Sequence, residues 1–144
     1  MKAENSNKYV QFVKYCLVGV LNTLVTFGVI YICKSFLDLN LYVSNALGYI
    51  AGVANSFLCN KQWVFQSKGG YRREAIIFVM GFLLCYGIQL WTVWIITDSW
   101  FGAEVYQLTD YIAISGYGIA TLVGNAVYTV ANFAYNKMVT FRRA

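Results

Sequence analysis

Two short segments of this chain are nearly the same, and each carries a polar Asn-Lys pair after a long apolar stretch. The segments are FLCNKQWVF (57–65) and FAYNKMVTF (133–141). In each, an asparagine precedes a lysine, as Asn60-Lys61 and Asn136-Lys137, and a phenylalanine follows four residues after the lysine. An ammonium group supplies a positive charge, and an amide supplies hydrogen-bond donors and an acceptor. Groups of this kind are costly to place beside hydrocarbon, so their repeated position calls for an explanation.

The elements that position these pairs are apolar and long. The chain has 144 residues, of which 59% are apolar and 12% charged, with no proline and no histidine. Four segments, at about 11–33, 42–60, 75–97 and 111–136, can each cross a hydrocarbon core about 30 Å thick. Only a helix satisfies every backbone group within one such segment. The sequence therefore predicts an all-α integral membrane protein with four transmembrane helices in a single domain, residues 1–144. The first helix is expected to be retained, because no small-residue cleavage site follows it closely.

The distribution of lysine and arginine predicts the orientation. With the amino terminus inside, only Lys34 among the 11 basic residues lies in an outer loop. The inner residues are Lys2, Lys8, Lys14, Lys61, Lys68, Arg72, Arg73, Lys137, Arg142 and Arg143. The acids Asp38, Asp98, Glu104 and Asp110 then lie outside. By the positive-inside rule, both termini are expected to be cytoplasmic in the cell membrane of a bacterium or archaeon.

The repeated segments indicate an internal duplication. Gly48 and Gly124 each precede the first phenylalanine of their segment by nine residues. We therefore expect two helical hairpins of the same orientation, which are parallel repeats of the kind known in transporters. The small residues at every fourth position of helices two and four predict close helix packing.

Polar side chains also fall inside the expected spans. Asn22, Asn55, Asn125 and Asn132 are the amides of interest. Asn125 and Asn132, seven residues apart, share one helix face, and Asn136 extends that face toward the cytoplasm. Such amides either hydrogen-bond neighbouring helices or line a groove that binds sugar hydroxyls, and the sequence leaves both open.

Several classes of function are disfavoured by the composition. An enzyme is not expected, because histidine, paired carboxylates, an activated nucleophile and a glycine-rich phosphate loop are all missing from the sequence. No cofactor and no metal is predicted, and the four cysteines are interpreted as packing residues. A proton-coupled exporter would carry a carboxylate within a span, and none is present there. The basic residues form short rims at the membrane, which argues against nucleic acid as a partner.

Three stretches together resemble a known family. They are YVQFVKYCLVGVLNTLVTFGV, SNALGYIAGVANSFLCNKQWVF and NFAYNKMVTFRR. They resemble the GtrA-like family of small four-span membrane proteins over essentially the whole chain. The most specific element is Asn-Lys/Arg-x-Trp-Val/Thr-Phe, present at 60–65. The second copy, at 136–141, has no tryptophan, and Asn55 stands one residue out of step with Asn132.

The resemblance implies translocation of a polyprenyl-phosphate-linked monosaccharide from the cytoplasmic to the outer leaflet. The sugar would then glycosylate a cell-surface polysaccharide or teichoic acid. A homo-oligomer is expected, because four helices offer little room to enclose a sugar. The alternative is a non-transporting membrane subunit that anchors or stabilises a partner glycosyltransferase.

The resemblance also suggests roles for the polar residues. Lys61 and Lys137, with Asn60 and Asn136 beside them, would receive the lipid phosphate, and Lys14 would join them or extend to the interface. The other residues are assigned by region: Trp63, Phe65 and Phe141 would wall the cytoplasmic mouth, and Asn22, Asn55, Asn125 and Asn132 would line the polar groove. A simpler interpretation stays open: a lysine at a helix C-terminus complements the helix dipole, and a tryptophan there anchors the helix at the interface.

Overall fold

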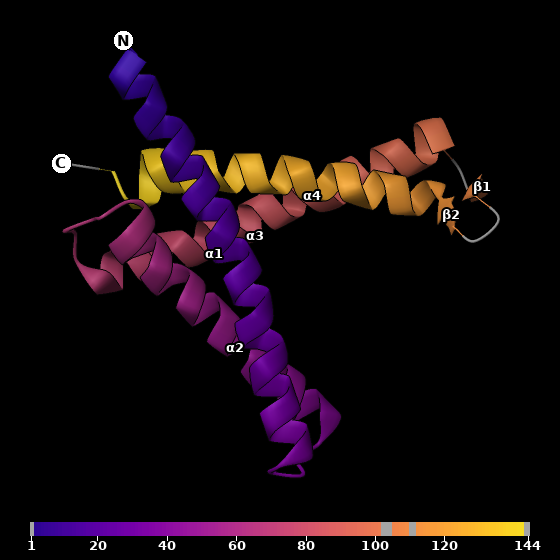
Figure 1. Ribbon diagram of the computed structural model, residues 1–144, viewed down its shortest axis with the longest axis horizontal. Coiled ribbons are helices and arrows are strands. Elements are labelled where there is room, and N and C mark those ends of the chain that lie inside the picture. Colours follow the sequence, from indigo (N-terminus) through magenta and orange to yellow (C-terminus); the bar gives the residue numbers. More distant parts are fainter. Residues whose placement is uncertain (1, 102–104, 110–111, 143–144) are drawn as a thin grey trace. The chain divides into compact units, whose positions relative to one another are not determined.

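The computed structural model describes residues 2–101, 105–109 and 112–142 (Figure 1). The elements are α1 (Lys2–Ser35), α2 (Leu41–Cys59), η1 (Asn60–Val64), α3 (Tyr71–Ile96), η2 (Thr97–Phe101), β1 (Val105–Thr109), β2 (Ile112–Ser115), α4 (Gly116–Tyr135) and η3 (Asn136–Thr140). The elements labelled η are short π-helical turns. The chain divides into two compact units, one ending at Gly70 and the other comprising Tyr71–Arg142. The four predicted helices are therefore present.

The first unit is a helical hairpin in which α1 packs along α2 (Figure 1). A tight turn reverses the chain after α1, with Asp38 in the left-handed region at φ 47°. Asn40 then caps α2, because its side chain accepts a hydrogen bond of 2.8 Å from the Tyr42 backbone N–H. An asparagine at this position satisfies one of the backbone donors that a helix N-terminus leaves unpaired. Local sequence thus determines where the second helix begins.

The second unit is a hairpin of α3 and α4 with a longer connection. That connection contains η2 and an antiparallel pair of strands, β1 and β2, with a bulge between Gln107 and Thr109. Ser115 caps α4 by accepting a hydrogen bond of 3.0 Å from the Gly118 N–H. The predicted fourth span, 111–136, therefore begins later, at Gly116. The apolar residues Ile112 to Ile114 suggested a helix, but β-branched residues before a serine cap equally suit a strand.

Some of the expected outer residues lie outside the described ranges. These are Glu104 and Asp110. Tyr111, where the fourth span was predicted to begin, and the basic residue Arg143 also lie outside the described ranges.

Glycine allows close helix contact in both units. A Cβ on Gly48 would lie 2.9 Å from the Thr26 carbonyl oxygen on α1 and 2.5 Å from the Ile30 side chain. A Cβ on Gly124 would lie 2.6 Å from Val93 Cγ2 on α3. Both glycines are buried. Their predicted role in helix packing is thus observed within each hairpin.

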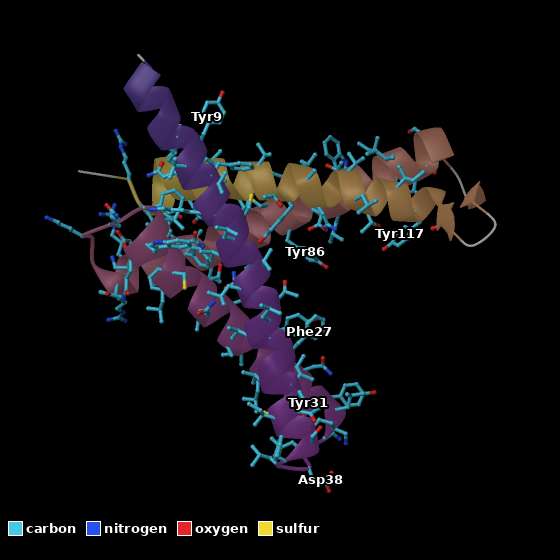
Figure 2. The ribbon with its side chains drawn as sticks, viewed as in Figure 1. Tyr9, Phe27, Tyr31, Asp38, Tyr86 and Tyr117 are labelled. Carbon is cyan, nitrogen blue, oxygen red and sulfur yellow. The ribbon has the colours of Figure 1, made fainter. Side chains whose placement is uncertain are left out.

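The outer surfaces of the hairpins are apolar. By length and composition, the segments Lys8–Ser35 and Tyr71–Ser99 are suited to crossing a membrane. Figure 2 shows Phe27 and Tyr31 standing out from α1, and both rings are well exposed. Exposed apolar surface this extensive is unfavourable in water and suits contact with lipid.

Helices α2 and α4 are shorter, with 19 and 20 residues, and each contains two asparagines. A helix of 19 residues is about 28 Å long, which matches a hydrocarbon core.

Candidate functional site

The repeated Asn-Lys segments form the same local structure in both units. At the ends of α2 and α4 the helix widens into the π-helical turns η1 and η3. The turns close with matching hydrogen bonds, from the Phe65 N–H to the Asn60 carbonyl at 2.9 Å and from the Phe141 N–H to the Asn136 carbonyl at 2.8 Å. Such widened turns are rare and occur often at functional sites. The duplication seen in the sequence is therefore also a duplication of local structure.

The two phenylalanines that end the turns are core residues. Phe65 packs edge-on against Tyr15 of α1, with ring centroids 6.4 Å apart. Phe141 packs against Phe78 of α3 in the matching place, at 6.1 Å. Both phenylalanines are buried. In the structure they pack the end of each hairpin against the neighbouring helix. Trp63, in contrast, is 45% exposed and accessible at the surface.

The asparagines of the two pairs are buried, and a hydrogen bond fixes the orientation of each side-chain amide. Asn60 donates its side-chain N–H to the Ser56 carbonyl at 2.8 Å. Asn136 donates in the same way to the side-chain oxygen of Asn132, at 3.2 Å. The counterpart of Asn132 in the first unit is therefore Ser56, and Asn55 lies one position away. Within the described chain, the side-chain oxygens of Asn60 and Asn136 are buried and have no hydrogen-bond donor.

The lysines of the two pairs differ, although their sequence positions match. Lys61 is only 2% exposed, and its ammonium donates a 2.6 Å hydrogen bond to the Gly69 carbonyl oxygen in the following loop. The Ser67 N–H also bonds to the Lys61 carbonyl, at 2.8 Å, and Gln66 between them has a positive φ of 51°. Lys61 therefore helps to fix the loop after η1.

Lys137 is only partly buried, and its ammonium lies over the Phe133 ring, 5.5 Å from the ring centroid. Lys14 on α1 lies over the Trp63 ring in the same way, at 5.3 Å. A cation above an aromatic face is attracted by the ring quadrupole, so both ammonium groups are positioned without full burial. The structure thus joins Lys14 to Trp63, a contact that sequence spacing did not indicate.

The predicted groove amides of the first unit are paired with each other. Asn55 on α2 donates to the side-chain oxygen of Asn22 on α1, at 2.7 Å. The Cys59 thiol donates weakly to Asn55 Oδ1, at 3.6 Å. The amide contact crosses the hairpin interface and therefore helps to hold α1 against α2.

The second unit has a longer series of polar contacts. Gln89 on α3 donates to the Asn125 side-chain oxygen at 2.7 Å. Closer to η3, Asn132 donates to the Tyr128 hydroxyl at 3.1 Å and accepts from Asn136. Gln89 and Tyr128 were not among the predicted site residues. Tyr128 lies four positions before Asn132, a spacing that places both on one helix face.

Thr140 was not among the predicted site residues either. It ends η3, is 4% exposed, and its hydroxyl has no hydrogen-bond partner among the described residues. Aligning the two repeats places Thr140 opposite Val64, so a polar residue occurs where the first copy has an apolar one. That difference between the repeats was the sequence feature that could have identified Thr140 as a candidate site residue.

Four apolar helices in two hairpins, with apolar side chains outward and polar contacts between helices, define an integral membrane protein. The chain belongs to the family described as GtrA/DPMS, transmembrane domain, which it matches over residues 14–141. The resemblance noted from the sequence is therefore confirmed.

Several curated proteins are similar over most of their length. The chain is 28% identical, over 133 residues, to the bactoprenol-linked glucose translocase of Shigella phage SfX, covering 92% of this chain and 96% of that protein. It is 27% identical, with the same coverage, to a prophage bactoprenol-linked glucose translocase homolog of Escherichia coli K12. It is 24% identical to the cell wall teichoic acid glycosylation protein GtcA of Listeria innocua serovar 6a, covering 89% of this chain and 82% of that protein.

Proposed function

We propose that this protein translocates a polyprenyl-phosphate-linked monosaccharide from the cytoplasmic to the outer leaflet. The observation that carries the proposal is the duplicated π-helical turn, in which a buried asparagine precedes a lysine at the end of each hairpin. Relatives that span nearly the whole chain are named as translocases of bactoprenol-linked glucose. The protein would move its substrate without changing it chemically, so we do not propose an enzyme.

The basic side chains are suited to the phosphate of such a lipid. Lys14 and Lys137 lie over aromatic rings, and neither ammonium is enclosed as that of Lys61 is. A phosphate at the interface is attracted to ammonium groups held in this way. Lys61 would contribute mainly by fixing the loop through Gly69. We therefore assign first contact with phosphate to Lys137 and Lys14, with Trp63 beside Lys14.

The amides provide hydrogen bonds for the sugar hydroxyls. Asn125 is exposed on α4, and Asn132 and Asn136 extend the polar series toward the end of η3. A sugar that leaves water needs such partners, because an unpaired hydroxyl is costly in hydrocarbon. Asn22 and Asn55 would bind the sugar only after the hydrogen bond between them breaks, so we rank them below the amides of α4.

The proposed topology rests on charge. Both termini and the loop after η1 would lie in the cytoplasm, and the loop between α1 and α2 would lie outside. The protein would be a multi-pass component of the bacterial or archaeal cell membrane. It would act as a homo-oligomer, because four helices enclose little volume.

Reconstitution tests the proposal directly. The purified protein would be placed in liposomes that carry labelled polyprenyl-phosphate glucose in one leaflet, and the label reaching the other leaflet would be measured over time. Faster transfer than in protein-free liposomes is expected, with Lys137→Met slower than the parent protein. Transfer at the protein-free rate for several lipid-linked sugars would refute translocation.

A second candidate function is a non-transporting subunit that stabilises a glycosyltransferase. The name of the Listeria relative specifies glycosylation and not transport, which is compatible with this role. Stable co-purification with a membrane glycosyltransferase, together with no transfer in liposomes, would favour it.

A further inference from the structure

The π-helical turn η3 contains two buried polar atoms, at its first and last residues, whose hydrogen-bonding capacity is unused. The Asn136 side-chain oxygen and the Thr140 hydroxyl have no partner among the described residues, and the residues are 0% and 4% exposed. They are four positions apart in one helical turn and so lie on nearly the same face. Buried polar groups are normally hydrogen-bonded, so two unsatisfied atoms at this spacing in one turn indicate a missing partner.

The Asn136 oxygen is held in place by its neighbours. The Asn136 N–H group donates to the Asn132 side-chain oxygen, and Asn132 in turn donates to the Tyr128 hydroxyl. Rotating the Asn136 amide by 180° would bring two oxygens together and lose the bond. With the two amides in this orientation, the Asn136 side-chain oxygen is left as an acceptor, so a partner of that oxygen must be a donor.

The first unit supplies an internal comparison. Asn60 is oriented by Ser56 in the same way, and its side-chain oxygen is likewise buried without a donor in the described chain. The position that matches Thr140, however, is Val64, which is buried and apolar. The acceptor is thus common to both units, whereas of the two turns only η3 adds the hydroxyl.

The chemistry of the two atoms limits the missing partner. An anion is excluded at the Asn136 side-chain oxygen, because an amide oxygen only accepts hydrogen bonds. A cation is disfavoured, because burial of a charge without an opposite charge is costly. A neutral hydroxyl fits, since it can donate a hydrogen bond to the Asn136 oxygen and can accept a second one from the Thr140 hydroxyl. Lys137, adjacent in the chain, provides the positive charge suited to a phosphate next to that hydroxyl.

We propose that Asn136 and Thr140 form a hydroxyl-binding site for the sugar of the lipid-linked substrate, and that Thr140 makes the second repeat the sugar-binding one. The inference rests on the proposed function. It adds a role for Thr140 and gives the two repeats different roles in binding the substrate. The site is closed in the structure, so the sugar hydroxyl would enter when the turn opens. The first repeat, with Val64, would bind no sugar hydroxyl through this position.

Thr140→Val tests the site, because it removes the hydroxyl while keeping the shape. Two probes would be compared by binding to the purified protein: a short-chain polyprenyl-phosphate glucose, and the same polyprenyl phosphate without sugar. Affinity for the glucose lipid is expected to fall about fivefold or more, the loss of one hydrogen bond. Affinity for the bare phosphate lipid should change less than twofold. Thr140→Ser should restore binding, and Val64→Thr should leave both affinities within twofold.

The melting temperature of the substrate-free protein separates this site from a structural role. Removing an unsatisfied hydroxyl should leave the melting temperature unchanged or raise it. A lower melting temperature in Thr140→Val would show that the hydroxyl already bonds to protein or water, and would overturn the proposal. Equal loss of affinity for both lipids, or no loss for either, would also overturn it.

Failure of the proposed function has a different result. If the parent protein prefers the glucose lipid and Thr140→Val loses that preference, yet no transfer occurs in liposomes, translocation is refuted and the hydroxyl site stands. If the parent protein transfers the lipid but does not distinguish the two probes, the site is refuted and translocation stands.

Discussion

At the scale of single residues, identical sequence positions have acquired different structural roles. Lys61 and Lys137 occupy the same place in their repeats, yet Lys61 is buried against a loop carbonyl and Lys137 lies partly exposed over an aromatic ring. The difference arises from the loop after η1, which returns to the turn and places the Gly69 carbonyl against the Lys61 ammonium. The Lys137 ammonium instead lies over Phe133, a residue of its own helix.

Replacing each lysine by methionine should separate these roles, because methionine keeps most of the apolar stem. Lys61→Met loses a charge-assisted hydrogen bond and should lower the free energy of unfolding by about 1.5–3 kcal/mol. Lys137→Met removes a partly buried side chain's cation–ring contact, which contributes about 1 kcal/mol or less, and should cost less than Lys61→Met. Thermal melting in detergent measures both. Surface glycosylation in cells should fall in Lys137→Met at normal protein levels.

The opposite order of stability would contradict this assignment. If Lys137→Met proved the less stable variant while Lys61→Met melted like the parent protein, the Lys61 contact with Gly69 would not contribute to stability.

At the scale of elements, each hairpin depends on a glycine that admits the neighbouring helix. Gly48 lies against the Thr26 carbonyl, a backbone atom that cannot rotate away. Gly124 lies mainly against side-chain atoms of Val93 and Gln89, which have more freedom to adjust. The two matched contacts therefore differ in how well they tolerate an added methyl group.

Gly48→Ala should destabilise the protein by about 1–3 kcal/mol, because the helices must separate to admit the new Cβ. Gly28→Ala on α1 is the control, since a Cβ there meets nothing within 4 Å. It should be neutral or stabilise by about 0.5–1 kcal/mol through helix propensity. Thermal melting of both variants measures the difference. Equal melting temperatures would show that α1 and α2 do not pack as described.

At the scale of the whole molecule, charge and duplication together predict how the chain is oriented in the membrane. Because basic residues recur at the same end of each hairpin, the loop after η1 is predicted to lie inside and the turn after α1 outside. The two connections lie at opposite ends of α2, so the charge distribution decides only which of them is inside.

Cysteine labelling tests this topology. Lys68→Cys and Leu37→Cys introduce thiols at exposed positions of the two connections. A membrane-impermeant maleimide added to intact cells should label Leu37→Cys only, and Lys68→Cys should react after the membrane is opened. The parent protein, with its four native cysteines, sets the background. The reverse pattern would invert the topology.

Much of this protein could be predicted from its sequence because the relevant signals are local. Apolar length indicated the four helices, and the nine-residue spacing from Gly48 to Phe57 and from Gly124 to Phe133 indicated the duplication. The predicted start of the fourth helix was too early, since an apolar run before a cap does not distinguish strand from helix. Asn55 is one residue out of step with Asn132 in the spacing, and the hydrogen bonds from Asn60 and Asn136 place Ser56 opposite Asn132.

The sequence by itself determined which residues are polar inside an apolar chain and how often the pattern recurs. Only the tertiary structure decided their partners: Asn22 with Asn55, Gln89 with Asn125, Lys14 with Trp63, and Lys61 with Gly69. The physical reason is that a hydrogen bond or ring contact depends on the rotation of one helix against another. That rotation is set by packing across the hairpin, at glycines such as Gly48, and not by the spacing of residues along one helix.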